Sequence, residues 1–391
     1  MSTKRWGVVI LMDMDQYYMH RAIDLADRAC GRTWPNPLVG CVVVKAGSVI
    51  AEGWHHKAGE AHAERDALLK LPTGAAAGAT LYVTLEPCCH QGRTPPCTDL
   101  IIAAGISRVV VGSTDPNPLV AGKGIRQLEA AGIDVTVGVA EARCQEQNLF
   151  FRHFMLQRRP YIAQKYAMTL DGKIAAVDGS SKWITGEQAR QHVQTLRKAY
   201  HSILIGSGTA LADDPLLTCR IDPQANPIRL ICDRRFRLHE DLQLVQTATE
   251  VRTILFSDSG STAADPLKKK RLTEVFGLEI YEQEGGFTVP DLVQKIAGLN
   301  IVSVLVEGGS SIHGSFLTAG LTDYVYAYIA PKLVGGELAP GPVGGAGLAP
   351  MASALTLTEP ILSRFGQDIL LAGRPQGTAG QDRSGELTEG N

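Results

Sequence analysis

The sequence predicts a two-domain α/β protein. Its 391 residues exceed the size of a typical single domain, and a hydrophobic share of 45% is enough to give each half its own core. Two series of alternating helix-like and strand-like segments run along the chain and meet between residues 148 and 160. We therefore expect one domain over residues 1–150, a second over 158–373, and a polar, glycine-rich, disordered tail over 374–391.

In the first domain, apolar residues at helical spacing predict a helix over 16–29. Pro35-Asn36-Pro37 then imposes a non-helical turn. The β-rich runs 39–44 and 49–53 flank Ala46-Gly47-Ser48 and predict a hairpin. The remaining elements alternate in the order helix 62–71, strand 80–85, helix 98–104, strand 109–112, helix 124–131 and strand 134–138.

The second domain is expected to begin after Arg158-Arg159-Pro160 with a strand over 161–168. A helix over 186–200 follows, and Thr185 is in position to cap it. A further helix is predicted over 291–298. The remaining predicted strands are 202–205, 228–232, 253–256, 278–281, 301–306, 324–329 and 368–372.

Charge and cysteine content exclude several classes of protein. The net charge is −2 with no basic stripe, which argues against a nucleic-acid partner. Eight cysteines scattered over the chain do not form a disulfide framework. The apolar run Val8–Met12 is too short for a signal peptide or a membrane span, so we expect a cytoplasmic protein with no membrane partner. Whether the residues before Met12 or Met14 are an upstream extension stays open.

A His/Cys constellation in the first domain predicts a zinc site. His62-Ala63-Glu64 opens a predicted helix, Cys88 follows a strand, and Cys97 precedes the next helix. One imidazole and two thiolates are the ligand set of zinc deaminases, which leave a fourth position for water. Glu64 lies too close along the chain to bind the same ion easily, but it can carry protons from water to the leaving amine. The pattern indicates a deaminase acting on an amino-substituted pyrimidine.

An alternative is that Cys88 and Cys97, spaced more widely than in the usual P-C-x-x-C, are ordinary buried thiols and His62 caps a helix. Other residues nearby could also compete as ligands. We expect Cys89 to point away from the metal, and the remaining candidates to be surface groups: His55, His56 and His90.

Two Asn-Pro turns have an open role. Asn36 and Asn117 each precede a proline, and such pairs form rigid turns without any ligand. Equally, each amide could lie over the pocket and bind a base or sugar.

The second half has no G-x-G-x-x-G after a strand, so it lacks a Rossmann fingerprint. Two glycine-rich turns, 206–209 and 308–311, follow predicted strands, and a helix begins after Gly309. Their small residues would let backbone amides approach phosphate oxygens, or they are plain tight turns.

Together these motifs resemble the bifunctional deaminase-reductase family of riboflavin biosynthesis. The resemblance covers residues 13–373 and rests on PNPLVGCVVV, HAE, TLEPCCHQGRTPPC, DPNPLVAGKG, QKYAMTLDGKIA, SKWITG, ADDPLLTCR, VEGGSSIHGSF and IAPKLVGG. It implies a cytidine-deaminase-like α/β/α domain followed by a dihydrofolate-reductase-like α/β domain. The family's long Cys-to-Cys loop matches the wide spacing here, and the family often has Ser or Ala in place of Cys89.

The resemblance implies that zinc and Glu64 deaminate 2,5-diamino-6-ribosylamino-4(3H)-pyrimidinone 5′-phosphate, and that NADPH then reduces the ribosyl group of the product to ribityl. It assigns to NADPH the residues Ala167, Trp183, Thr209, Asp213, Gly308 and Gly309. It assigns to the substrate Ser181, Arg197, Leu217, Arg220 and Glu307.

Several of these residues have plainer interpretations. Arg197 and Arg220 suit a 5′-phosphate, but arginines also form surface ion pairs. Lys165 would orient the substrate or relay a proton, or it is a structural lysine at a strand end. Trp183 would stack on the cofactor or lie in the core.

The expected partners are small pyrimidine ribosyl phosphates, and we expect a homo-oligomer. The alternative function is a zinc deaminase of another nucleobase or nucleoside whose second domain serves only for binding. The neutral charge balance and the family-like second half argue against it.

Overall fold

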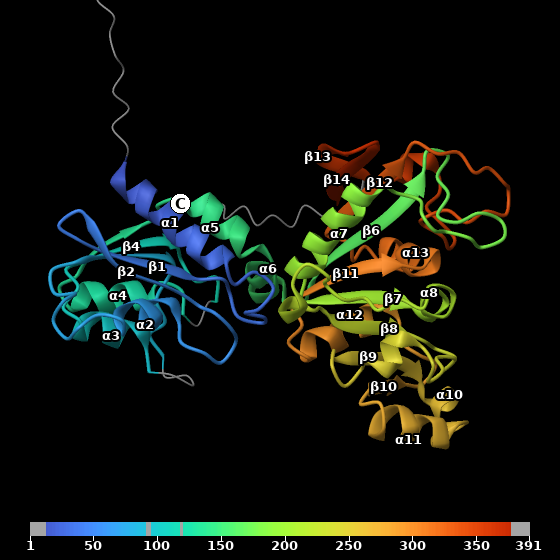
Figure 1. Cartoon of the computed structure of the whole chain (residues 1–391), viewed down its shortest axis with the longest axis horizontal. Coiled ribbons are helices and arrows are strands. Elements are labelled where there is room, and N and C mark those ends of the chain that lie inside the picture. Colours follow the sequence, from blue (N-terminus) through green and yellow to red (C-terminus); the bar gives the residue numbers. More distant parts are fainter. Residues whose placement is uncertain (1–12, 91–94, 118–119, 377–391) are drawn as a thin grey trace, which may run out of the picture. The chain divides into compact units, whose positions relative to one another are not determined.

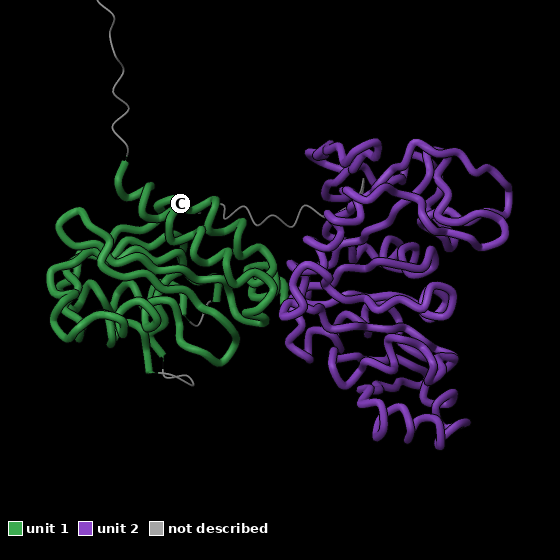
Figure 2. Tube along the Cα trace, in the orientation of Figure 1, with its two compact units in different colours: residues 1–158 green, residues 159–391 purple. Residues whose placement is uncertain are grey.

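The structure is a computed structural model that describes residues 13–90, 95–117 and 120–376 (Figure 1). The chain forms two compact units, residues 1–158 and 159–391 (Figure 2). Each unit contains its own sheet, and each holds one of the two alternating series read from the sequence. The apolar run 8–12 and the tail beyond 376 lie outside the described residues.

Unit 1 is built on a five-stranded sheet in the order β2-β1-β3-β4-β5. The first two strands form the expected hairpin, and β1 also pairs antiparallel with β3, whereas β3, β4 and β5 are parallel. The strands are β1 (Gly40–Lys45), β2 (Ser48–Trp54), β3 (Thr80–Leu85), β4 (Arg108–Ser113) and β5 (Asp134–Val137).

Helices cover both faces of this sheet, because successive strand side chains alternate between two apolar cores. Cys41 and Val43 face one core, while Val42 and Val44 face the other. The first core is closed by α2 (Ala63–Leu68), α3 (Cys97–Ala103) and α4 (Lys123–Ala130), and the second by α1 (Met14–Asp27) and α5 (Glu141–Gln147). Figure 1 shows these two helical layers. The arrangement places the ends of α2 and α3 beside the end of β3.

Unit 2 is built on a nine-stranded sheet in the order β10-β9-β8-β7-β11-β6-β12-β14-β13. The run from β10 to β12 is parallel, and the chain then closes with the antiparallel strands β14 and β13. The strands are β6 (Tyr161–Thr169), β7 (Ser202–Gly206), β8 (Ile228–Cys232), β9 (Thr253–Asp258), β10 (Glu279–Gln283), β11 (Ser303–Gly308), β12 (Tyr324–Ala330), β13 (Thr356–Phe365) and β14 (Asp368–Gln376).

The helices of unit 2 also pack on both faces. Apolar residues of β7 point alternately to two cores, with Ile203 and Ile205 in one and Leu204 in the other. The longer helices are α7 (Glu187–Ala199), α11 (Pro266–Glu274), α12 (Val289–Gly298) and α13 (Ser310–Thr318), and the shorter ones are α8 (Ser207–Asp213), α9 (Gln243–Gln246) and α10 (Ser259–Ala263). Both α8 and α13 begin directly where a parallel strand ends, which is where ligands bind in open α/β sheets.

Several expectations need correction. The segment interpreted only as a change of unit contains α6 (Leu149–Gln157), and α5, directly before it, was not predicted. Thr185 does not cap α7, since the N-cap residue is Gly186 and no side chain makes a capping bond there; the Gly186 backbone N–H donates to the Asp368 carboxylate at 2.7 Å. The second domain extends past 373, since β14 pairs through Gln376 with Thr356. Strand β13 was not predicted, because it is largely exposed and lacks apolar alternation.

Within the described part of the chain, no helix combines the length and apolar character that crossing a membrane requires.

Candidate active sites of the two units

His62 holds the N-cap position of α2, where the backbone is extended (φ −71°, ψ 161°). Its side chain makes no capping hydrogen bond, so the imidazole is free to turn toward the end of β3. The alternative in which His62 serves as a helix cap is therefore wrong.

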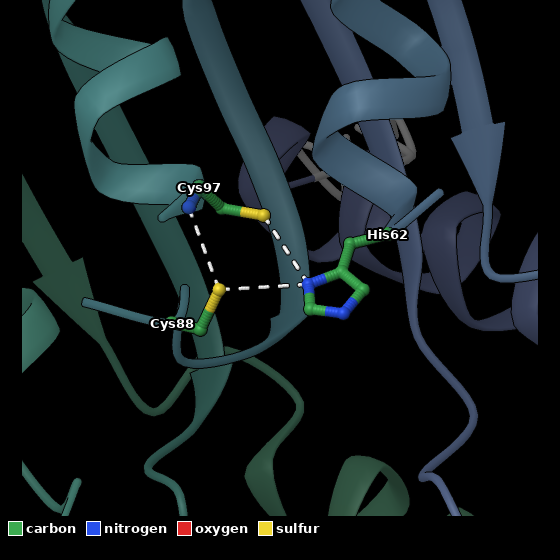
Figure 3. A group of neighbouring side chains, drawn as sticks. All are labelled: His62, Cys88 and Cys97. Atoms are coloured by element: carbon green, nitrogen blue, oxygen red, sulfur yellow. Dashed lines mark hydrogen bonds between the residues drawn. The ribbon is translucent and has the colours of Figure 1, made fainter. Parts of the chain in front are cut away.

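Cys88 and Cys97 converge on the same imidazole from two other elements (Figure 3). Cys88 lies in the loop after β3, and Cys97 is the first residue of α3. Nδ1 of His62 is 3.5 Å from Sγ of Cys88 and 3.4 Å from Sγ of Cys97. Zinc bonds of ~2.0 Å to nitrogen and ~2.3 Å to sulfur at a tetrahedral angle would separate such atoms by ~3.5 Å. The donor set and its spacing therefore fit one zinc ion.

The electrostatics of the two thiols also suit a cation. The pKa of Cys88 is lowered to about 4 by hydrogen bonds from the Cys97 thiol and from His62, against the effect of burial. The pKa of Cys97 is raised, because its proton is held by the neighbouring Cys88 thiolate and because it is buried. Without metal the pair carries one negative charge, and a bound cation stabilises the second thiolate.

Glu64 lies on the first turn of α2, beside this group, and is only 3% exposed. Burial, reinforced by the nearby charge of Cys88, raises the pKa of its carboxyl to about 7. A carboxyl with that pKa can both accept and donate a proton at neutral pH. Glu64 thus has the position and the chemistry of a proton carrier.

The competing residues do not join the ligand group. Among the described residues, the cluster with ligand atoms within 4.8 Å of one another consists of His62, Cys88 and Cys97, without Cys89 or His90. The expectation that His55 is a surface group is wrong, since it is 3% exposed. His56 does lie at the surface side, where its ring pairs with Asp66 at 3.2 Å.

Buried His55 explains how Asn36 is held. Nδ1 of His55 is 3.0 Å from the carbonyl oxygen of Ala61, and Nε2 is 3.1 Å from Nδ2 of Asn36. A neutral ring that donates to Ala61 must accept from Asn36, and burial lowers the pKa of His55 in keeping with that state. The carbonyl oxygen of the Asn36 amide therefore points away from His55, while the ring of His55 packs edge-on against His62 at 5.7 Å between centroids.

The second Asn-Pro turn is tied to its own aspartate. The backbone N–H of Asn117 donates to Oδ1 of Asp115 at 2.8 Å. Burial raises the pKa of Asp115, with smaller contributions from Glu86 and Cys88, so this turn lies within electrostatic range of the ligand loop.

In unit 2, a single cavity of about 550 Å³ is lined by every residue assigned to the reductase. The structure thereby brings together residues from β6, α7, α8, β11 and the loops that follow them. They are Lys165, Ala167, Ser181, Trp183, Arg197, Thr209, Asp213, Leu217, Arg220, Glu307, Gly308 and Gly309.

A buried charge cluster forms the floor of this cavity. Arg197 holds Glu307 through two hydrogen bonds of 2.8 Å, and Nζ of Lys165 lies 3.7 Å from the same carboxylate. These cations outweigh burial and lower the pKa of Glu307 to about 2. Burial in turn lowers the pKa of Lys165. Arg197 is therefore not a surface ion pair, and much of its donor capacity is used by Glu307 and by the carbonyl of Thr218.

The glycine-rich turns sit at the cavity where backbone must approach closely. A Cβ on Gly308 would lie 3.1 Å from Oγ1 of Thr209, and Gly309 has φ +75°. Leu217 also has a positive φ of 51°, although it is buried. Such backbone in a leucine is uncommon and tends to cluster at ligand sites. Trp183 is 60% exposed, with Arg190 over its ring at 4.5 Å, so the interpretation as a core residue is wrong.

Two residues that the structure places at the sites, His55 and His313, were not predicted as site residues from the sequence. His55 was set aside because loop histidines are usually exposed, and its burial depends on tertiary contacts with Asn36 and Ala61. His313 lines the unit 2 cavity, and burial lowers its pKa to about 4. Its place one turn into the helix after Gly309 could have indicated that it faces the cavity.

Comparison with known proteins matches each unit to a known domain. Residues 12–113 match the cytidine and deoxycytidylate deaminase zinc-binding region, and residues 160–371 match the RibD C-terminal domain. The riboflavin biosynthesis protein RibD of Actinobacillus pleuropneumoniae is 47% identical over 364 residues, covering 92% of this chain and 95% of that protein. The chain belongs to the RibD family.

Solved structures of the family have the same fold. RibD of Acinetobacter baumannii is 38% identical with a TM-score of 0.82, and it covers 93% of this chain and 99% of its own. The diaminohydroxyphosphoribosylaminopyrimidine deaminase/5-amino-6-(5-phosphoribosylamino)uracil reductase of Thermotoga maritima is 37% identical with a TM-score of 0.78, with the same coverage.

Family membership confirms the fold class and the broad function. The chain has a cytidine-deaminase-like domain followed by a dihydrofolate-reductase-like domain. It is a bifunctional enzyme of riboflavin biosynthesis, a deaminase and a reductase, with Zn²⁺ and NADPH as cofactors. The alternative of a lone deaminase with a binding module is not favoured.

Proposed function

We propose that the two units catalyse consecutive steps on one pyrimidine ribosyl phosphate. Unit 1 deaminates 2,5-diamino-6-ribosylamino-4(3H)-pyrimidinone 5′-phosphate. Unit 2 reduces the ribosyl group of the product, which gives 5-amino-6-ribitylaminouracil 5′-phosphate. The observation that carries the proposal is the convergence of His62, Cys88 and Cys97 beside a buried Glu64.

In the deaminase site, His62, Cys88 and Cys97 would hold zinc, and zinc lowers the pKa of a bound water to about 7. Glu64, buried beside these ligands, would accept a proton from water and donate it to the departing amine. Asn36, held by His55, presents its carbonyl oxygen to a donor on the base or sugar. Asn117, on the turn held by Asp115, would likewise form a hydrogen bond to the base or sugar.

In the reductase site, NADPH supplies the hydride. Ala167, Trp183 and Thr209 would contact NADPH together with Asp213 and the amides of the Gly308-Gly309 turn. The small residues of that turn admit phosphate oxygens close to backbone N–H groups at the start of α13.

The substrate would lie between Ser181, Leu217 and the charge cluster. Arg220 is exposed, and no carboxylate pairs with its guanidinium among the described residues, which suits it to bind the 5′-phosphate. Arg197 fixes Glu307 and would offer the substrate the guanidinium N–H groups that Glu307 and Thr218 do not use. Lys165, with a lowered pKa, orients the ribosyl group or relays a proton to it.

We also propose that the enzyme is a cytoplasmic homo-oligomer. The structure forms no disulfide among the described residues, as expected in a reducing compartment. Unit 2 exposes large apolar side chains, with Leu338 84% and Met351 87% exposed, which a second copy would cover. Sedimentation of the purified chain tests the assembly, and a monomer at micromolar concentration would contradict it.

The decisive experiment supplies the diaminopyrimidine phosphate with and without NADPH and follows ammonia release and NADPH absorbance. We expect ammonia in both reactions and NADPH oxidation only after deamination. NADPH oxidation without ammonia, or ammonia without any later oxidation, would contradict the order of the two steps.

A further inference from the structure

Glu86 is a buried carboxylate that the proposed mechanism does not use. It is the first residue after β3 and lies two positions before the ligand Cys88. Only 4% of the residue is exposed, and its backbone N–H donates to the carbonyl of Ser113 at the end of β4. A buried carboxylate at this place requires an explanation, because its desolvation is costly unless donors surround it.

Four backbone N–H groups surround the Glu86 carboxylate. Oε1 accepts from Gly124 at 2.9 Å and Ile125 at 3.3 Å, and Oε2 accepts from Gly122 at 2.9 Å and Asp115 at 3.2 Å. These bonds use the whole acceptor capacity of a carboxylate. The N-cap residue of α4, Gly122, has no side chain to offer, so Glu86 caps this helix from another element.

The two segments that Glu86 binds, the start of α4 and the Asp115 turn, also contact other parts of the deaminase site. A Cβ on Gly124 would lie 2.2 Å from the carbonyl oxygen of Pro87, so α4 begins in direct contact with the residue before Cys88. From α4, Gln127 accepts a hydrogen bond from Thr98, which follows Cys97. Asp115, held by its N–H, accepts in turn from Asn117.

We propose that Glu86 is a positioning residue of the deaminase. It acts through backbone amides and fixes the Asp115–Asn117 turn and the start of α4 relative to Cys88. It does not touch the substrate. The inference rests on the proposed function in one respect, because it takes Asn117 to bind the substrate of unit 1.

The first test is Glu86→Gln in the full-length holoenzyme. The amide keeps the size of the side chain but turns one acceptor into a donor that faces N–H groups. We expect the KM for the diaminopyrimidine phosphate to rise about 10- to 100-fold, as for other residues that orient active-site groups without touching the substrate. Bound zinc should stay near one per chain, and reduction of the pre-deaminated substrate by unit 2 should not change.

The matched control is Glu129→Gln, which removes the same charge from an exposed position of the same helix. It should leave zinc content, both KM values and both kcat values unchanged. Loss of zinc from Glu86→Gln would show that the carboxylate only maintains the metal loop and would overturn the inference. An unchanged deaminase KM would overturn it as well.

A double-mutant cycle with Asn117→Ala separates positioning from general support. If Glu86 acts through this turn, Asn117→Ala raises KM in the wild-type background and adds little in Glu86→Gln. Multiplicative fold-changes would contradict the inference while leaving the proposed function intact. No effect of Asn117→Ala alone would instead remove Asn117 from the proposed function, and the inference would fall with it.

Discussion

Glu64 in unit 1 and Glu307 in unit 2 are both buried carboxyls at the centre of a site, yet their pKa values move in opposite directions. Glu64 has a thiolate for a neighbour, and its pKa rises to about 7. Glu307 lies between Arg197 and Lys165, and its pKa falls to about 2. Burial alone would raise both values, so the neighbouring charge decides the outcome.

This difference gives the two carboxyls different chemistry. Glu64 exchanges a proton near neutral pH and is suited to carry one between water and a leaving group. Glu307 stays ionised throughout the physiological range, so it anchors Arg197 and Lys165 without exchanging protons.

The largest expected effect comes from Glu64→Gln. Removal of a general acid–base group should lower the deaminase kcat by about 10²–10⁴-fold. Zinc content should not change, because the proposed ligands are His62, Cys88 and Cys97. The reductase, assayed on pre-deaminated substrate, should keep full activity. Ammonia release at the wild-type rate would remove Glu64 from its role.

The chemistry of unit 1 could be predicted from the sequence because it depends on short, local patterns. His62 and Glu64 are two residues apart at a helix start, and Cys88 and Cys97 flank a loop between a strand and a helix. Such spacing predicts a ligand set and a proton carrier, and the structure brings the three predicted ligands together. The burial of His55 depends on contacts with Asn36 and Ala61 and was not accessible in this way.

Unit 2 was harder to predict, because its site is assembled from residues far apart in the chain. Only the resemblance to a family assigned these residues to one site. No local pattern predicted that Arg197 and Glu307, 110 positions apart, form a buried pair. Strand β13 was not predicted from the sequence for a related reason. It is an edge strand whose place is set by pairing with β14 and not by an apolar pattern of its own.

The second prediction concerns the buried pair itself. Arg197→Ala leaves Glu307 with Lys165 at 3.7 Å as its cation, and loss of one partner of a buried pair costs about 3–5 kcal/mol. The unfolding free energy of unit 2 should fall, and the reductase KM for its pyrimidine substrate should rise, while deamination is unaffected. Lys198→Ala, on the same helix with a more exposed partner, is the control. Equal effects of the two variants would argue against a special role for the Glu307 pair.

The third prediction is a pair of opposite pH dependences. A raised pKa gives Glu64 a contribution to stability that is present below pH 4.5 and lost as the pH rises to about 7. The lowered pKa of Glu307 gives a contribution that is present above pH 4.5 and lost as the pH falls to about 2. Each shift corresponds to about 3 kcal/mol.

In metal-depleted protein, Glu64→Gln should therefore become more stable than the wild type as the pH rises from 5 to 8. Glu307→Gln should lose its disadvantage relative to the wild type as the pH falls from 5 toward 2. Denaturant unfolding across this range measures both differences. Differences that do not vary with pH would contradict the assigned shifts.

The smallest expected effect is at Trp183. Its exposed ring lines the unit 2 cavity, with Arg190 over its face, and does not hold the charge cluster together. Trp183→Ala should raise the KM for NADPH roughly fivefold, equivalent to about 1 kcal/mol of lost stacking. Thermal stability should change little, and Val177→Ala, exposed in the same unit, should not alter KM. A large loss of stability would return Trp183 to a structural role.

The central contrast can be measured directly by ¹³C NMR titration of the glutamate carboxyl carbons in metal-depleted protein. Glu64→Gln and Glu307→Gln assign the two signals by their disappearance. We expect midpoints near pH 7 for Glu64 and near pH 2 for Glu307, on opposite sides of the ordinary value of 4.5. Two midpoints near 4.5, or both on the same side of it, would contradict the account.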